Sequence, residues 1–190
     1  MAHLTSFEGV HQLHYLGVID IDSVEQSIAL SQTFQQQGPP SIDPHTANVS
    51  PPMVRSVEER IIEKVEHAQL IGTIARRPSA QRGEPKVAVH VSKTGVKFID
   101  VSSQRVVERL ALHKIVQAIS YDDGFNFDGE QPAHFNVILV VKRSTFADRG
   151  MEQCHLLQTQ NAAEADHLCK QIRQAFASVQ ADVVPSSKRL

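Results

Sequence analysis

The chain has 190 residues, of which 41% are hydrophobic and 21% are charged. This composition is ordinary for a globular protein, and it excludes a coiled coil or a wholly disordered chain. The 19 Lys and Arg residues nearly balance the 21 Asp and Glu residues, for a formal net charge of −2. The chain therefore lacks the positive field of a general nucleic-acid-binding protein, and we expect one main domain with no nucleic-acid partner.

The sequence shows no membrane or secretion signal. Its longest apolar run, 137–141, is far shorter than the roughly 20 residues that span a bilayer. The first residues have neither the basic segment nor the apolar segment of a secretory signal. The two cysteines, Cys154 and Cys169, are too few for a disulfide framework, which favours reduced thiols. We expect a cytoplasmic protein with no transmembrane segment.

The N-terminal part alternates between ordered segments and loops. Strand-forming residues predict a strand over 11–21, in which Gly17 marks a close backbone approach. We expect a short helix over 24–30. The proline-rich stretch at 38–53 is predicted to be an inserted loop, because it cannot bury enough apolar surface to offset the entropy of ordering. Ser56 and Glu59 stand at capping-box spacing and predict an amphipathic helix that ends near residue 72.

The C-terminal part reads as strands followed by one helix. Apolar residues alternate with polar ones from Lys86, and the turn at 92–95 predicts a hairpin. Further strands are expected at 106–110, 114–120, 134–142 and 153–158. Asn161 and Glu164 then begin the clearest helix. Consecutive strands without crossover helices exclude a doubly wound fold, so we expect a pair of antiparallel sheets or a partly open barrel, capped by this helix.

Several short strings, in this order, resemble the phosphotyrosine-binding (PTB, or PID) domain family. They are Tyr-Leu-Gly at 15–17, Val-Ser-Lys-Thr-Gly-Val-Lys-Phe at 91–98, the strand at 115–121 and Gln-Ala-Phe at 174–176. The resemblance spans roughly residues 13–179. The segment 112–124, which contains Ile-Ser-Tyr-Asp-Asp-Gly, is most similar to the integrin-cytoplasmic-domain-associated adaptor type of this family.

The resemblance implies an α+β domain with a PH-like/PTB fold over residues 10–181 and a flexible tail over 182–190. Such a domain is a seven-stranded orthogonal antiparallel β-sandwich capped by a C-terminal helix, with an additional helix between the first two strands. It also implies a non-enzymatic adaptor that binds Asn-Pro-x-Tyr or Asn-Pro-x-Phe segments in the cytoplasmic tail of an integrin or receptor. The peptide adds to the exposed edge of the fifth strand, beside the terminal helix.

The positions that match this groove lie on the fifth strand and on the terminal helix. They are Ile115, Val116, Gln117, Ala118, Ile119 and Ser120 on the strand, and Cys169, Ile172, Arg173 and Phe176 on the helix. The apolar stripe of the helix also has a simpler explanation, because the same side chains can seal the core. We expect Ile172 and Phe176 to touch the ligand and Ala165 and Leu168 to belong to the core.

A phosphate group or an anionic phospholipid is the alternative ligand. Its candidate residues are Arg76, Arg77 and Arg82 in a loop, where charged side chains are usually solvated. A PH-like module that binds phosphoinositides at the membrane surface would use this cluster together with Lys93 and Lys97. A third possibility is a groove occupied by the chain's own segment at 38–52.

Catalytic and metal-binding chemistry finds little support in the sequence. The common hydrolase, phosphate-loop and metalloprotease motifs are absent. Cys154-His155 and His167-x-Cys169 form the best metal-ligand set, but their spacing does not match that of structural zinc sites. The acidic loop at 122–129 lacks the EF-hand spacing for calcium. We therefore expect no enzyme, no metal and no cofactor.

Overall fold

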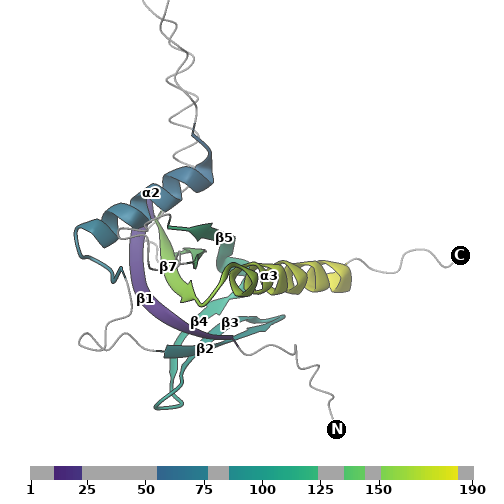
Figure 1. Cartoon of the computed structure of the whole chain (residues 1–190). Helices are drawn as coiled ribbons and strands as arrows, with labels where there is room; N and C mark the ends of the chain where they lie inside the picture. Colours follow the sequence, from purple (N-terminus) through teal and green to yellow (C-terminus); the bar gives the residue numbers. More distant parts are fainter. Residues whose placement is uncertain (1–10, 23–54, 77–85, 124–134, 144–150, 184–190) are drawn as a thin grey trace, which may run out of the picture.

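The computed structural model describes residues 11–22, 55–76, 86–123, 135–143 and 151–183 (Figure 1). The elements in chain order are β1 (His11–Asp22), α2 (Val57–Leu70), β2 (Lys86–Ser92), β3 (Gly95–Asp100), β4 (Val106–Ala111), the 3-10 turn η1 (Leu112–Lys114), β5 (Ile115–Asp122), β6 (Phe135–Lys142), β7 (Met151–Thr159) and α3 (Ala162–Val183). The predicted strands and the two longer helices are all present. The predicted helix at 24–30 and the proline-rich loop at 38–53 lie outside the described residues.

All strand pairs are antiparallel, and the strands form one sheet in the order β4-β3-β2-β1-β7-β6-β5. The first residues of β1, His11 to His14, pair with β2, whereas His14 to Asp22 pair with β7. The long, curved β1 thus joins two halves of the sheet (Figure 1). Seven antiparallel strands, a terminal helix and one additional helix are confirmed and are compatible with a PTB-like fold. The predicted sandwich of two sheets is not confirmed, because β1 is hydrogen-bonded to both halves.

β1 bends where Gly17 lies. The register between β1 and β7 shifts between Tyr15 and Gly17, and Gly17 has a φ of +135°. A Cβ atom on Gly17 would lie 3.0 Å from Cγ2 of Ile74, in the segment that follows α2. The close backbone approach that the sequence predicted at Gly17 is therefore present, and glycine satisfies both the φ angle and the contact.

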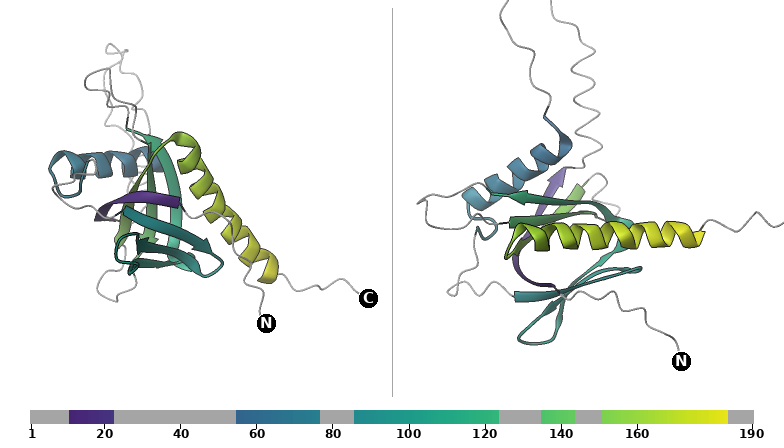
Figure 2. Two further views of the ribbon diagram at one scale, coloured as in Figure 1. Left: turned by 60° about the horizontal axis from the view of Figure 1, so that its bottom comes forward. Right: turned by 45° about the vertical axis from the view of Figure 1, so that its right-hand side comes forward.

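Two clusters of buried side chains lie on opposite faces of the β5–β6–β7 half of the sheet. One cluster joins alternate residues of β6 and β7, among them Leu139 and Leu157, with β2, β3 and α3. The other joins the intervening residues, among them Ile138 and Leu156, with α2. This explains why Asn136 to Val141 of β6 are all buried, because both faces of the strand are covered. The two helices therefore cover different faces of the sheet (Figure 2).

Both helices begin as the sequence predicted. The Ser56 hydroxyl accepts from the backbone N–H of Glu59 at 3.1 Å, and the Glu59 carboxylate accepts from the Ser56 N–H at 2.8 Å. At α3, the Asn161 side chain accepts from the N–H of Glu164 at 2.9 Å. These bonds satisfy N–H groups that have no partner inside the helix. None of the helices in the described part of the chain is long and apolar enough to cross a membrane.

Candidate functional site

The outer edge of β5 is the main candidate for a binding surface. β5 is the last strand of the sheet, and its ladder to β6 is its only strand pairing within the described residues. α3 packs against β5 from one side (Figures 1 and 2). An edge strand carries backbone N–H and C=O groups that face away from the sheet, so a second extended chain can hydrogen-bond to it.

A bulge interrupts the start of this edge. Ile115 lies opposite Val141, and Gln117 lies opposite Val140, so Val116 has no residue opposite it in β6. Val116 is accordingly exposed, at 41%. From Gln117 to Asp122 the ladder is regular. The part of β5 with the geometry to pair with a peptide therefore begins at Gln117.

Side-chain hydrogen bonds hold β5 between the two helices. The Gln117 amide donates to the Glu58 carboxylate of α2 at 2.8 Å. The Ser120 hydroxyl donates to the Asp166 carboxylate of α3 at 3.0 Å. The sequence did not single out Glu58 or Asp166, since neither stands near β5 along the chain. They fix the strand against α2 and α3 before any ligand arrives.

Four of the ten predicted peptide-binding residues are buried in the free protein. Ile115, Cys169 and Ile172 belong to the cluster under α3, and Ile119 belongs to the cluster under α2. Each is at most 5% exposed. The other six, which are partly or fully accessible, are Val116, Gln117, Ala118, Ser120, Arg173 and Phe176. Ligand contact stays a prediction for all ten, and the four buried residues shape the surface from below.

Cys169 lies where α3 meets β5. Its side chain is fully buried, and burial raises the pKa of its thiol. The positive charge of Arg173 and a hydrogen bond from Ser120 lower that pKa in part. Phe176, one turn after Ile172, is half-buried and packs against the same cluster. The structure therefore brings the end of β5 and the middle of α3 together, as the predicted groove requires.

Of the three predicted phosphate-binding arginines, Arg76 lies among the described residues. Arg77 and Arg82 lie outside them. Arg76 lines a small pocket with Glu63, Glu66 and Asp123. Burial raises the pKa of Glu66, with Asp123 and Glu63 adding to the effect, while Arg76 lowers it. Arg76 thus lies among carboxylates, which does not favour a phosphate ligand there.

The best metal-ligand set of the sequence is split between the two sides of the sheet. Cys154 belongs to the cluster under α2, and Cys169 belongs to the cluster under α3. Both are free thiols. His155 lies beside Tyr15, with 2.9 Å between the Tyr15 hydroxyl and Nδ1 of His155. These residues do not converge on one metal ion.

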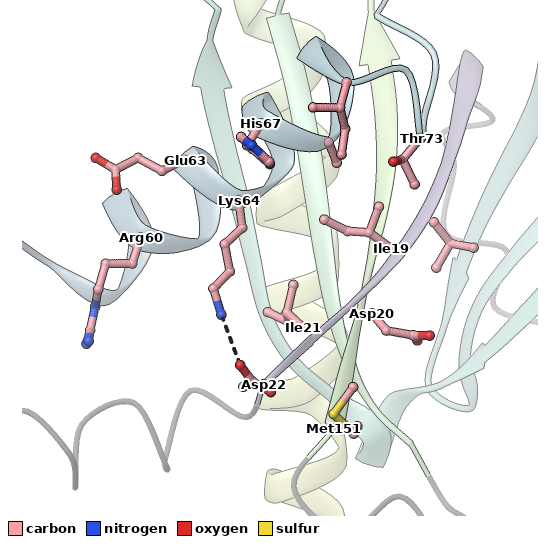
Figure 3. A pocket seen from close by; sticks show the side chains of 13 residues that line it. Ile19, Asp20, Ile21, Asp22, Arg60, Glu63, Lys64, His67, Thr73 and Met151 are labelled. Atoms are coloured by element: carbon pink, nitrogen blue, oxygen red, sulfur yellow. Dashed lines mark ion pairs between the residues drawn. The ribbon is translucent and has the colours of Figure 1, made fainter.

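A larger cleft, of about 780 Å³, lies between β1 and α2 (Figure 3). Ile19 and Ile21 of β1 and Ala68 of α2 supply its apolar lining. Lys64 of α2 reaches across to Asp22 of β1, with 3.8 Å between Nζ and the carboxylate (Figure 3). No local sequence pattern predicted this cleft, because its two walls lie more than 30 residues apart along the chain.

Comparison with known proteins identifies a family. A family model described as "Beta-1 integrin binding protein" matches residues 53–185, which is well over half of the chain. The match covers α2, strands β2 to β7 and α3, and so includes both walls of the candidate groove. No curated protein matches the chain.

Proposed function

Since the chain belongs to the β1-integrin-binding protein family, we propose that it is a non-enzymatic adaptor domain that binds a short segment of an integrin or receptor cytoplasmic tail. The observation that carries the proposal is the edge of β5. It is regular from Gln117 onward, and α3 packs beside it. The ligand is an extended segment of the Asn-Pro-x-Tyr or Asn-Pro-x-Phe type.

Backbone hydrogen bonds to β5 supply part of the affinity and no sequence selectivity. Selectivity comes from side chains beside the strand, where Phe176 and Arg173 of α3 and Ala118 of β5 are accessible. Phe176 offers a half-buried aromatic surface to an apolar side chain of the peptide. Arg173 favours a peptide that carries a carboxylate at the facing position.

The proposed ligand is the unphosphorylated tail. A phosphotyrosine pocket in the groove needs several converging cations, but Arg173 is the single cation among the ten predicted groove residues. Arg76 lies among Glu63, Glu66 and Asp123. A small groove of this kind supports a transient contact, with a dissociation constant in the micromolar range, or about −8 kcal/mol. Recruitment to the plasma membrane would follow from the membrane anchorage of the tail.

The test is a fluorescence-polarisation titration of the full chain with labelled tail peptides. Four peptides are compared: Asn-Pro-x-Tyr, its phosphotyrosine form, an Ala-Ala replacement of Asn-Pro, and a form with N-methylated backbone amides upstream of Asn-Pro. N-methylation removes donors to β5 and leaves every side chain in place. The proposal expects saturable binding of the first peptide and at least about tenfold weaker binding of the last two.

Two outcomes would contradict the proposal. If none of the peptides binds, the β5 edge is not a tail-binding site. If the N-methylated peptide binds as well as its parent, the ligand does not pair with a strand and must use another surface. A preference for the phosphotyrosine form would retain the adaptor function but overturn the expected phosphorylation state.

A further inference from the structure

A cleft of about 280 Å³ lies between β4, η1 and the adjoining ends of β6 and β7. Besides Gln153, the polar part of its lining consists of Glu108, Arg109, Lys114, Lys142, Arg143 and His155. Four of these are cations and one is a carboxylate. The residues come from four separate elements, so the fold, and not the local sequence, brings them together.

His155 is the most unusual residue of this lining. It is only 2% exposed, and its ring stacks on Tyr15 and meets the edge of Phe98 in the core. Nδ1 lies 2.9 Å from the Tyr15 hydroxyl, whereas Nε2 is buried and has no hydrogen-bond partner among the described residues. Because His155 also lines the cleft, this cationic lining includes a side chain with a buried nitrogen that has no partner among the described residues.

The hydrogen bond to Tyr15 indicates which nitrogen of His155 carries the proton. Burial lowers the pKa of His155 and raises that of Tyr15 to about 12, so both groups are neutral near pH 7. If Tyr15 donates to Nδ1, only the Nε2–H lacks a partner. In the other tautomer, the Tyr15 hydrogen and the Nε2 lone pair both lack one. The first arrangement leaves fewer buried polar groups unsatisfied, so Nε2 is a donor.

Two of the four cations around this donor, Arg109 and Lys114, keep their charge available for a ligand. Neither Arg109 nor Lys114 forms an ion pair with another described residue. Arg143 pairs with Asp20 at 3.1 Å. The opposing carboxylate, Glu108, accepts from the backbone N–H of Arg109 at 2.9 Å, which holds it against its own strand. The lining therefore combines a surplus of positive charge with a neutral N–H donor.

We propose that this cleft binds a phosphate group, either as inorganic phosphate or as a phosphomonoester, through Arg109, Lys114 and the Nε2–H of His155. Phosphate supplies several strong acceptor oxygens, which suit a guanidinium, an ammonium and an imidazole N–H at once. The volume is at the small end of ligand sites and suits one phosphate with a small substituent. The site is separate from the proposed peptide groove, since none of its lining lies on α3 or on the regular part of β5.

The test is an NMR titration of the full chain with inorganic phosphate at constant ionic strength, with chloride as the reference anion. The readouts are the ring nitrogens of His155 and the backbone amides of β4. The variant is Arg109→Gln with Lys114→Gln, and the matched control is Lys86→Gln with Arg105→Gln. Both double variants remove two positive charges from accessible side chains, and only the first lies in the cleft.

The proposal expects that phosphate causes a saturable chemical-shift change of the His155 ring nitrogens. Before phosphate is added, Nε2 should carry the proton. The affinity should fall at least about tenfold in the cleft variant and stay unchanged in the control. A His155→Gln variant, whose amide can still meet Tyr15, should bind more weakly while its melting curve shows it folded. Shifts that do not saturate, or an equal loss in both double variants, would show unspecific screening of charge and overturn the site.

A second arm identifies the source of the phosphate. Co-sedimentation is measured with phosphatidylcholine vesicles that contain or lack a phosphatidylinositol phosphate. Retention that depends on Arg109 and Lys114 would identify a lipid headgroup, whereas phosphate binding without retention would identify a soluble phosphate. Retention that is independent of both residues, without phosphate binding, would refute the site. Tail-peptide affinity of the same variants should not change, so failure here is distinguishable from failure of the proposed adaptor function.

Discussion

Phe176 of α3 can belong either to the peptide groove or to the core. Its replacement by alanine tests the proposed groove most directly. Phe176 is half-buried against the cluster under α3, whereas Leu168, two turns earlier, is fully buried in it. If Phe176 lines the groove, Phe176→Ala should weaken peptide binding with a modest loss of stability. Leu168→Ala should cause a large loss of stability, while its folded fraction binds the peptide nearly as well as the parent chain.

The magnitudes follow from burial. Removing a fully buried leucine side chain costs about 3–5 kcal/mol, and the same range holds for a fully buried phenylalanine. At partial burial, Phe176→Ala should cost about 2 kcal/mol, which lowers the melting temperature by about 4–8 °C in a chain of this size. An aromatic anchor at a binding surface is worth about 2 kcal/mol, so the peptide affinity should fall about 30-fold.

The assay combines thermal melting with the peptide titration on three variants. The third, Gln174→Ala, changes an exposed position of α3 and should leave both readouts unchanged. The reasoning is refuted if Phe176→Ala melts as low as Leu168→Ala while its folded fraction binds peptide within about threefold of the parent chain. Phe176 would then be a core residue, and the groove would lie elsewhere.

Three further predictions concern stability. Gly17→Ala forces a residue with a side chain to adopt a φ of +135° and to lie against Ile74, so the free energy of unfolding in urea should fall by about 1–3 kcal/mol. A smaller loss would mean that the backbone of β1 can change its conformation at this position without strain. Ser56→Ala removes the capping bond to Glu59 and should cost about 1 kcal/mol, whereas Ser56→Asp should be nearly neutral; equal losses would show that the cap adds nothing. The folded-state pKa of His155 lies below its ordinary value, so the unfolded chain binds more protons and stability should fall as the pH drops below about 6.5. In His155→Gln this acid-side loss, followed by melting temperature, should shrink, and an unchanged slope would assign it to other groups.

The elements of this protein follow from local features of the sequence. Ser56 with Glu59 and Asn161 with Glu164 predicted the two helix starts, and the same hydrogen bonds are present. Capping depends on residues three positions apart, so it can be recognised without knowledge of the fold. Gly17 was predicted as a close backbone approach because it is a glycine inside a strand pattern, but its neighbour Ile74 could not be identified from the sequence.

The candidate site was predicted only in outline. The family resemblance implied that Ile115 to Ser120 lie on an edge strand and Cys169 to Phe176 on the adjoining helix, and the structure brings the two segments together. The sequence did not reveal that Cys169 and Ile172 lie under the surface, because a stripe of apolar residues on a helix looks the same whether it meets a sheet or a ligand. The bulge at Val116 was also invisible, since it depends on the register with β6.

The sequence by itself determined the number, order and type of the described helices and strands, because hydrophobic period, caps and turns act within a few residues. The family resemblance implied the ligand class. Tertiary structure decided what depends on residues far apart along the chain. The continuity of β1 merges the expected sheets into one, and the covering of β6 on both faces separates Cys154 from Cys169. The cleft around His155 exists because β4, β6 and β7 place cations from distant segments beside one buried imidazole. No local pattern encodes such a meeting, since it depends on strand register and on the curvature of the sheet.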